Sequence, residues 1–126
     1  MGSDLWWADA AHDAGSKVWL YQPFAQQPDR WPADWQAHHR RVRNYASRVA
    51  VLDATASTKA LFARNDWMIR DCDALIAVVD PEHRGGGTHA AVASAQNRRP
   101  IIRIDVRARE TRLVLPRKAP GIPPVR

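Results

Sequence analysis

The residues best placed to do chemistry lie around three consecutive glycines that follow Asp80 and precede Thr88. The apolar run before Asp80 predicts a strand, and the alanine-rich stretch after Thr88 predicts a helix. The glycines would then leave backbone N–H groups at the positive end of that helix, an arrangement that suits phosphate or another anion. Asp80 and Thr88 would add an acceptor and a hydroxyl for the sugar and phosphate of a nucleotide. The alternative is a strand–helix turn that needs glycine only for its backbone angles.

Histidines are the candidates for proton transfer. His83 and His89 flank the glycine loop and are placed for general acid–base work, with solvated loop residues as the alternative. His38 and His39 are adjacent, so on a helix they point about 100° apart and cannot share a metal unaided. With a single cysteine in the chain, we expect no zinc site.

Helix and strand patterns alternate along the chain. Apolar spacing predicts helices over residues 4–14, 33–46, 58–70 and 88–97, and strands over residues 17–21, 48–53, 74–79 and 100–105, with an edge strand at 112–115. Ser3 or Asp4 would cap the first helix. The unbroken apolar run at 74–79 is typical of a strand covered on both faces. The alternation therefore predicts a mainly parallel sheet with helices on both sides, where ligands bind beyond the carboxyl ends of the strands.

Six tryptophans could stack on a ligand or fill the core. Trp6, Trp19 and Trp67 fall in the apolar pattern, which predicts that they are core residues. Trp31 and Trp35 lie near the proline-rich loop after the first predicted strand, and they are the better candidates for a pocket wall.

Length and charge favour one domain with a tail. The 126 residues predict a domain over residues 1–115 and a basic, proline-rich tail over residues 116–126. The net charge is +6, yet the nine Lys and Arg from Arg98 onward, against Asp105 and Glu110, contribute +7, so the preceding 97 residues sum to −1. The basicity belongs to the C-terminal part, which weakens the case for a phosphate-tracking face on the domain itself.

The remaining composition favours the cytoplasm. No apolar run approaches the roughly 20 residues that span a bilayer, so we expect no membrane partner. The start carries an acid and no basic signal-peptide region. Cys72 is the only cysteine, which excludes an internal disulfide and fits a reducing compartment.

Five short stretches, in this order, resemble the SLOG superfamily of Rossmann-like proteins, in its YpsA-like branch, kin to DNA-processing protein A and the lonely-guy enzymes. They are residues 2–6, 63–69, 72–78, 86–88 and 99–102. The resemblance runs to about Asp105. It implies a Rossmann-like three-layer α/β sandwich with a mainly parallel sheet of four to five strands.

The resemblance also implies a site for a nucleotide or a related phosphate compound, such as an ADP-ribose-like ligand or a nucleotide sugar. In the family, an early glycine loop and a later Gly-Gly-Thr loop meet the same ligand. The matching residues here are Gly2, Ser3, Asp4, Gly85, Gly86, Gly87 and Thr88, with Arg64 and Asn65 at the rim, and Asp80 joins them from its place at the strand end. Arg64 could instead form a salt bridge with an aspartate of its own helix, either Asp66 or Asp71.

Two departures from the family pattern bear on function. Family members usually begin with a strand, a helix and a second strand before the first glycine loop, whereas this sequence starts inside that loop. We therefore expect a fragment, a late start or a partner that covers the exposed sheet edge, most simply a homodimer with Trp6 or Trp7 at the contact. The lonely-guy enzymes also place a catalytic Glu after their glycine-threonine loop, and residues 89–94 hold no carboxylate.

These observations predict binding or sensing of a nucleotide-derived, phosphate-containing ligand. The first alternative is an enzyme that hydrolyses or transfers at a nucleotide's glycosidic bond, with Asp80, His83 or His89 in place of the absent Glu. The second alternative is single-stranded nucleic-acid binding that resembles DNA-processing protein A, aided by the basic tail.

Overall fold

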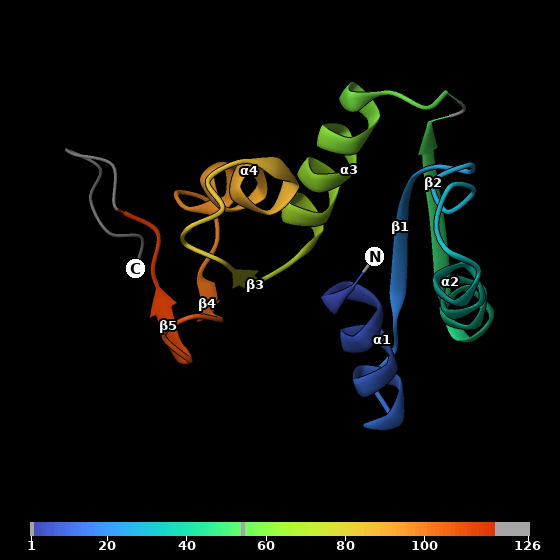
Figure 1. Cartoon of the computed structure of the whole chain (residues 1–126). Coiled ribbons are helices and arrows are strands. Elements are labelled where there is room, and N and C mark those ends of the chain that lie inside the picture. The colour runs from blue at the N-terminus through green and yellow to red at the C-terminus, as the bar shows by residue number, and fades with distance from the viewer. Residues whose placement is uncertain (1, 54, 118–126) are drawn as a thin grey trace. The chain divides into compact units, whose positions relative to one another are not determined.

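The computed structural model describes residues 2–53 and 55–117, which form a mixed α/β protein (Figure 1). The chain divides into two compact units, residues 1–64 and 65–126. The first unit contains α1 (Ser3–Asp13), β1 (Trp19–Phe24), α2 (Ala33–Tyr45) and β2 (Arg48–Asp53). Helix α3 (Thr58–Asp71) crosses the boundary, and the second unit continues with β3 (Leu75–Val79), α4 (Gly86–Ala95), β4 (Ile101–Asp105) and β5 (Glu110–Val114). Each helix and strand expected from the sequence is present, with bounds that agree to within three residues.

The first unit is built on two parallel strands. β1 pairs with β2 from Trp19 opposite Arg48 to Phe24 opposite Asp53. α1 and α2 share a small core, because Leu5 of α1 and Val42 of α2 are both buried. The partly buried side chains around them are Val18, Leu20, Trp31, Trp35 and Tyr45. Packing of the two helices on each other therefore orders the first unit.

Proline 23 lies inside β1, although the sequence predicts that the strand ends before it. Pro23 has no backbone N–H to donate, and it is skipped in the register between Gln22 opposite Val51 and Phe24 opposite Asp53. Among the described residues, β1 pairs only with β2, so a proline within it costs no ladder bond on its other side.

The second unit holds a three-stranded sheet in the order β3-β4-β5, with β3 and β4 parallel and β4 and β5 antiparallel. Its core joins α3, the sheet and α4 through buried side chains, which are Ile69, Ala77, Val79, Ala95 and Ile101. The expectation that β3 is covered on both faces is wrong. Ile76 and Val78, which point away from Ala77 and Val79, are each more than one-third exposed.

The expectation of a single, mainly parallel sheet of four to five strands, as in a three-layer sandwich, is also wrong. The strands form two small sheets, one of two strands and one of three. Helix–strand alternation predicts parallel neighbours across α2 and across α4, and both parallel pairs are present. The hydrogen bonds between strands join backbone N–H and C=O groups, which nearly every residue carries. The alternation of helices and strands in the sequence therefore does not determine which further strands pair.

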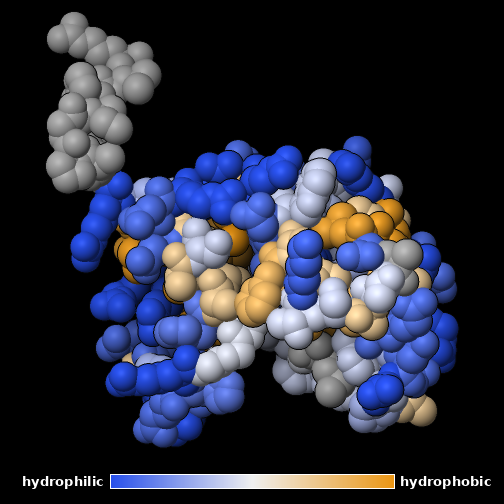
Figure 2. Space-filling model, turned by 90° about the horizontal axis from the view of Figure 1, so that it is seen from above, coloured by the Kyte–Doolittle hydropathy of each residue, from blue (hydrophilic) through white to orange (hydrophobic). Residues whose placement is uncertain are grey.

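Large apolar side chains also reach the surface, where Figure 2 shows hydrophobic areas among hydrophilic ones. The expectation that Trp6, Trp19 and Trp67 are core residues is wrong, because they are 62%, 54% and 43% exposed. In α1, Leu5 and Ala8 take the buried face, and Trp6 lies about 100° around the helix from Leu5. Within the described residues, no helix combines the length and apolar character needed to cross a membrane.

Candidate functional site

The glycine loop borders a pocket of the second unit. The chain leaves β3 at Val79, turns through residues 80–85 and enters α4 at Gly86. A space of about 700 Å³, here called the glycine-loop pocket, lies against this turn and the first turns of α4. It is lined by Val78, Val79, Asp80, Pro81, His83, Arg84, Gly85, Gly86, Gly87, Thr88, His89, Val92, Ala93, Gln96 and Arg103. Several predicted site residues therefore border one space, namely Asp80, Gly85, Gly86, Gly87 and Thr88.

Asp80 is held by Arg107, a residue that no sequence pattern places at the site. Nε and Nη2 of Arg107 donate to Oδ1 and Oδ2 of Asp80 at 2.6 and 3.0 Å, and Nη1 lies 3.2 Å from Oε2 of Glu82. The hydrogen bond from Arg107 lowers the pKa of Asp80, and the backbone N–H of Glu82, which donates to Oδ1 at 3.0 Å, lowers it further. Asp80 is therefore ionised at neutral pH, and a sugar hydroxyl would share its oxygens with Arg107.

The backbone of the loop accounts for the need for glycine at one position. Gly86 has a φ of 88°, which side chains rarely adopt, and a Cβ there would stand 3.5 Å from Nε2 of His83. Before it, the loop turns where the His83 N–H donates to the Asp80 carbonyl at 3.0 Å. Cβ atoms added to Gly85 or Gly87 would meet only open space. Gly86 thus has a conformational role, and its two neighbours leave room beside the backbone.

The N-terminus of α4 is open to an anion. Its N-cap residue is Gly85, which has no side chain to accept from the first N–H groups, and the first turn contains no acidic residue. Thr88, His83 and His89 are exposed around it. Unclaimed N–H groups at the positive end of a ten-residue helix favour a negative ligand.

Arg103 lines the pocket and is, after Arg107, the second residue near the glycine loop that sequence reasoning missed. It pairs across the sheet with Ala77, so its side chain emerges on the side of the sheet that α4 covers. The signal was present in the sequence, since Arg103 interrupts an isoleucine-rich strand at a position where an apolar residue would be expected.

The first group of predicted site residues lies in the first unit. Gly2, with a φ of 98°, is the N-cap of α1, and neither Ser3 nor Asp4 makes the expected capping bond. Arg64, also in this unit, is half-buried, and burial lowers its pKa while the negative charge of Asp4 raises it. Asp4 and Arg64 thus interact electrostatically. Of the two alternative partners on its own helix, Asp66 accepts from Nη1 of Arg98 at 2.7 Å, and a salt bridge with Asp71 stays a prediction.

Asn65 is the first residue of the second unit and is half-buried. The predicted residues therefore fall into two groups, one around the start of α1 with Arg64 and one around the glycine-loop pocket. That the two groups meet one ligand stays a prediction. Within the described part of the chain, no three His, Cys, Asp or Glu side chains group in a way that could hold a metal ion.

Comparison with known families gives one match. The model of the YspA SLOG family matches residues 1–107, which include both groups of predicted residues and Arg107. The chain belongs to the YspA SLOG family. The resemblance drawn from the short motifs is thereby confirmed, and SLOG membership brings a Rossmann-like fold and a nucleotide-related function in general terms. A search of curated proteins found no match.

Proposed function

We propose that this SLOG-family chain binds or senses a phosphate-containing nucleotide or nucleotide-derived ligand at the glycine-loop pocket. The observation that carries the proposal is the uncapped N-terminus of α4, which opens on a space of about 700 Å³. That volume lies within the range of about 300–1,000 Å³ in which pockets hold small ligands. The proposed phosphate binds at Gly85, Gly86, Gly87 and Thr88.

The charges around the pocket support an anionic ligand. Three charged residues line it, namely Asp80, Arg84 and Arg103, and Arg107 neutralises Asp80 from outside. Arg84 and Arg103 remain as positive charges, and His83 and His89 can add hydrogen-bond donors. A phosphate at the helix end would therefore meet positive charge and N–H donors in one place.

A ligand screen with matched glycine variants tests the proposal. Inorganic phosphate, ribose 5-phosphate, AMP, ADP-ribose and a nucleotide sugar are compared by thermal shift, and calorimetry then gives the affinity of the best ligand. Gly86→Ala should abolish phosphate-dependent binding, because the left-handed backbone at the loop would have to change. Gly15→Ala is the control, since Gly15 has a similar φ of 82° but follows α1.

Both glycine variants should lose comparable stability, about 1–2 kcal/mol each, and only Gly86→Ala should lose the ligand. Thr88→Val separates the hydroxyl from the backbone and should weaken binding without affecting the loop. Unchanged affinity in a folded Gly86→Ala variant would place the phosphate site elsewhere.

An enzyme at the same pocket is the second candidate, because His83 and His89 line the space together with Asp80. Asp80 is ionised, so it would act as a base or stabilise positive charge, and a histidine would supply the proton to the leaving base. Release of free base from nucleoside monophosphates or NAD-like compounds, lost in His89→Gln or His83→Gln, would support hydrolysis or transfer. Binding without turnover would favour sensing.

Nucleic-acid binding through the basic tail is a further candidate, and residues 118–126 of that tail lie outside the described residues. Arg107 holds Asp80, so a truncation that removes it would disturb the loop as well as the tail. A chain that ends at residue 115 leaves this ion pair intact. Loss of a steeply salt-dependent affinity for single-stranded DNA in that variant would support the tail's role.

A further inference from the structure

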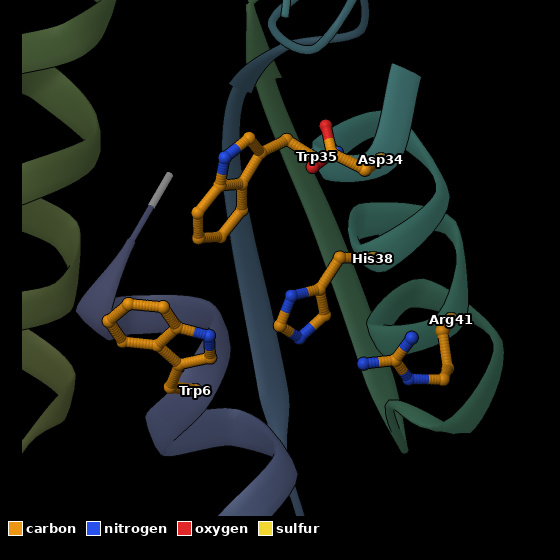
Figure 3. A pocket seen from close by; sticks show the side chains of 5 residues that line it. All are labelled: Trp6, Asp34, Trp35, His38 and Arg41. Atoms are coloured by element: carbon orange, nitrogen blue, oxygen red, sulfur yellow. The ribbon is translucent and has the colours of Figure 1, made fainter. Parts of the chain in front are cut away.

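A second pocket lies between α1 and α2 of the first unit. It has a volume of about 260 Å³ and is lined by Trp6, Asp34, Trp35, His38 and Arg41 (Figure 3). We call it the tryptophan pocket. All five residues belong to residues 1–64, so the pocket is defined without reference to the glycine loop. Trp31 and Trp35 are the two tryptophans that the sequence marks as candidates for a pocket wall. Both are partly buried against the core of the first unit, and Trp35 lines this pocket whereas Trp31 does not.

One carboxylate fixes the walls of this pocket. Asp9 of α1 lies 2.7 Å through Oδ2 from Nε2 of His38, and the same oxygen accepts from Nη2 of Arg41 at 2.9 Å. Its Oδ1 accepts from the hydroxyl of Tyr45 at 2.7 Å. Three bonds from α2 to one residue of α1 hold His38 and Arg41 in place before any ligand arrives. Such preorganisation reduces the entropy that binding must offset.

The rings of the pocket offer an exposed stacking surface. Trp6 and Trp35 have centroids 5.7 Å apart at 47°, and Trp35 and His38 have centroids 5.7 Å apart at 12°. These separations are already those of direct ring contact, so a further ring cannot enter between them. In Figure 3 the indole of Trp35 points toward α1 and lies beside that of Trp6. Because Trp6 is 62% exposed, a flat ring can stack on its open face.

The two ends of the pocket carry opposite charge. Asp34 and Arg41 are seven residues apart on α2, which separates them by about 10 Å along the helix. Arg41 uses one Nη on Asp9, which leaves further N–H groups to donate, and its side chain is 59% exposed. Oδ1 of Asp34 accepts from the backbone N–H of Trp35 at 3.0 Å, and its carboxylate can accept from a ligand. A ligand lying along α2 would meet a cation at one end and an acceptor at the other.

We infer that the tryptophan pocket binds a flat aromatic ring that carries an anionic group toward Arg41 and a hydrogen-bond donor toward Asp34. An amino-substituted nucleobase monophosphate has this combination. The volume holds one ring system rather than a whole drug-sized ligand, so the sugar and phosphate extend toward Arg41 and solvent. The ring binds by stacking, and the phosphate adds a charge-assisted hydrogen bond.

Calorimetry on the full chain, with AMP, adenosine and ribose 5-phosphate as probes, tests this inference. Trp6→Ala should weaken both AMP and adenosine about 10-fold, because both probes stack. Trp67→Ala is the control, since Trp67 is also an exposed tryptophan on a helix, is 43% exposed, belongs to the second unit and lines neither pocket. Equal effects of the two substitutions, or no saturable binding of adenosine and AMP at millimolar concentration, would overturn the inference.

Charge variants test the orientation of the ligand. Arg41→Gln should weaken AMP severalfold and leave adenosine nearly unchanged, whereas Arg40→Gln, which changes the neighbouring exposed arginine, should affect neither. IMP, which has a carbonyl in place of the amino group of AMP, should bind less tightly, and Asp34→Asn should remove that preference. A preference for AMP that survives Asp34→Asn would overturn the assigned orientation.

The two sites can fail separately in these experiments. Ribose 5-phosphate has no aromatic ring to stack on Trp6, so its binding reports on the glycine loop and should be lost in Gly86→Ala but kept in Trp6→Ala. Loss of adenosine binding in Trp6→Ala supports the tryptophan pocket even if ribose 5-phosphate never binds. Adenosine binding that depends on Gly86 and not on Trp6 would overturn the tryptophan pocket and leave the proposed function standing.

Discussion

The two pockets of this chain are held in place by different means. In the first unit, Asp9 collects three side-chain bonds from α2 and thereby sets the positions of the rings around it. In the second unit, the glycine loop depends on backbone geometry, on the left-handed Gly86 and on the ion pairs that Arg107 forms with Asp80 and Glu82. Side-chain networks are disrupted by a change of one partner, whereas a backbone-defined loop tolerates most side-chain changes and few backbone ones.

Among the variants that test this comparison, Asp9→Asn, which removes the Asp9 charge, should have the largest effect on stability. Asp9→Asn weakens the bonds to His38, Arg41 and Tyr45 together, so we expect a loss of about 2–3 kcal/mol in the free energy of unfolding. Urea denaturation measures it. Asp13→Asn, at the exposed end of the same helix, is the control and should change stability by less than about 0.5 kcal/mol. A similarly small effect at Asp9 would show that packing alone positions α1 on α2.

The same network predicts a loss of stability in strong acid. Hydrogen bonds, the first from Tyr45, outweigh burial and lower the pKa of Asp9 from 3.8 to about 2. Because the folded-state pKa is the lower one, the unfolded chain takes up the proton first, and the stabilisation present above pH 3.8 is lost as the pH falls toward about 2. The difference in stability between the wild type and Asp9→Asn should shrink over that interval. A difference in stability that stays constant over that interval would contradict the lowered pKa of Asp9.

Histidine 39 should give a smaller pH dependence near neutrality. His39 is buried, its Nε2 has no hydrogen-bond partner among the described residues, and it meets the ring of Trp31 edge-on at 5.6 Å. Burial, and then the charge of Arg43, lowers its pKa below 6.5, so the unfolded chain binds the proton more readily and stability falls as the pH drops below 6.5. His39→Leu should remove up to about 1.4 kcal/mol per pH unit of this slope. His89→Gln, at an exposed site, should retain it.

The Arg107 ion pair should have little effect on stability and a clear one on anion binding. Arg107→Gln leaves Asp80 uncompensated beside the glycine loop, so ribose 5-phosphate should bind severalfold more weakly. Asp80→Asn combined with Arg107→Gln should restore most of the affinity. Arg112→Gln, on exposed β5, is the control for a general charge effect. If the double variant binds no better than Arg107→Gln alone, Arg107 contacts the ligand or shapes the loop in another way.

We propose that the chain self-associates through the first unit. We expect this effect to be the smallest of those predicted. Trp6, Trp7 and Trp19 are each more than half exposed, and exposed tryptophans are enriched at protein interfaces. Light scattering over a dilution series should show a homodimer that dissociates more readily in Trp7→Ala. A monomer at high micromolar concentration would contradict the proposal. The Gly86→Ala variant should dimerise like the wild type.

Several features of this protein were fixed by local sequence. The bounds of β2 at Arg48–Asp53 follow from its apolar run, and the start of α2 at Ala33 follows from Pro32, which precedes it. The glycine-loop motif, together with the other short stretches, revealed the SLOG family. Each of these depends on backbone preferences within a few residues.

Only the tertiary structure decided which residues meet across long stretches of chain. The contacts of Asp9 with Tyr45 and of Asp80 with Arg107 join residues 36 and 27 positions apart, and no local pattern encodes such a pairing. The same holds for the division of the strands into two sheets and for the exposure of Trp6, which depends on the face of α1 that α2 covers. Periodicity gives the faces of an element, but the packing of one element on another determines which face is buried and which side chains converge.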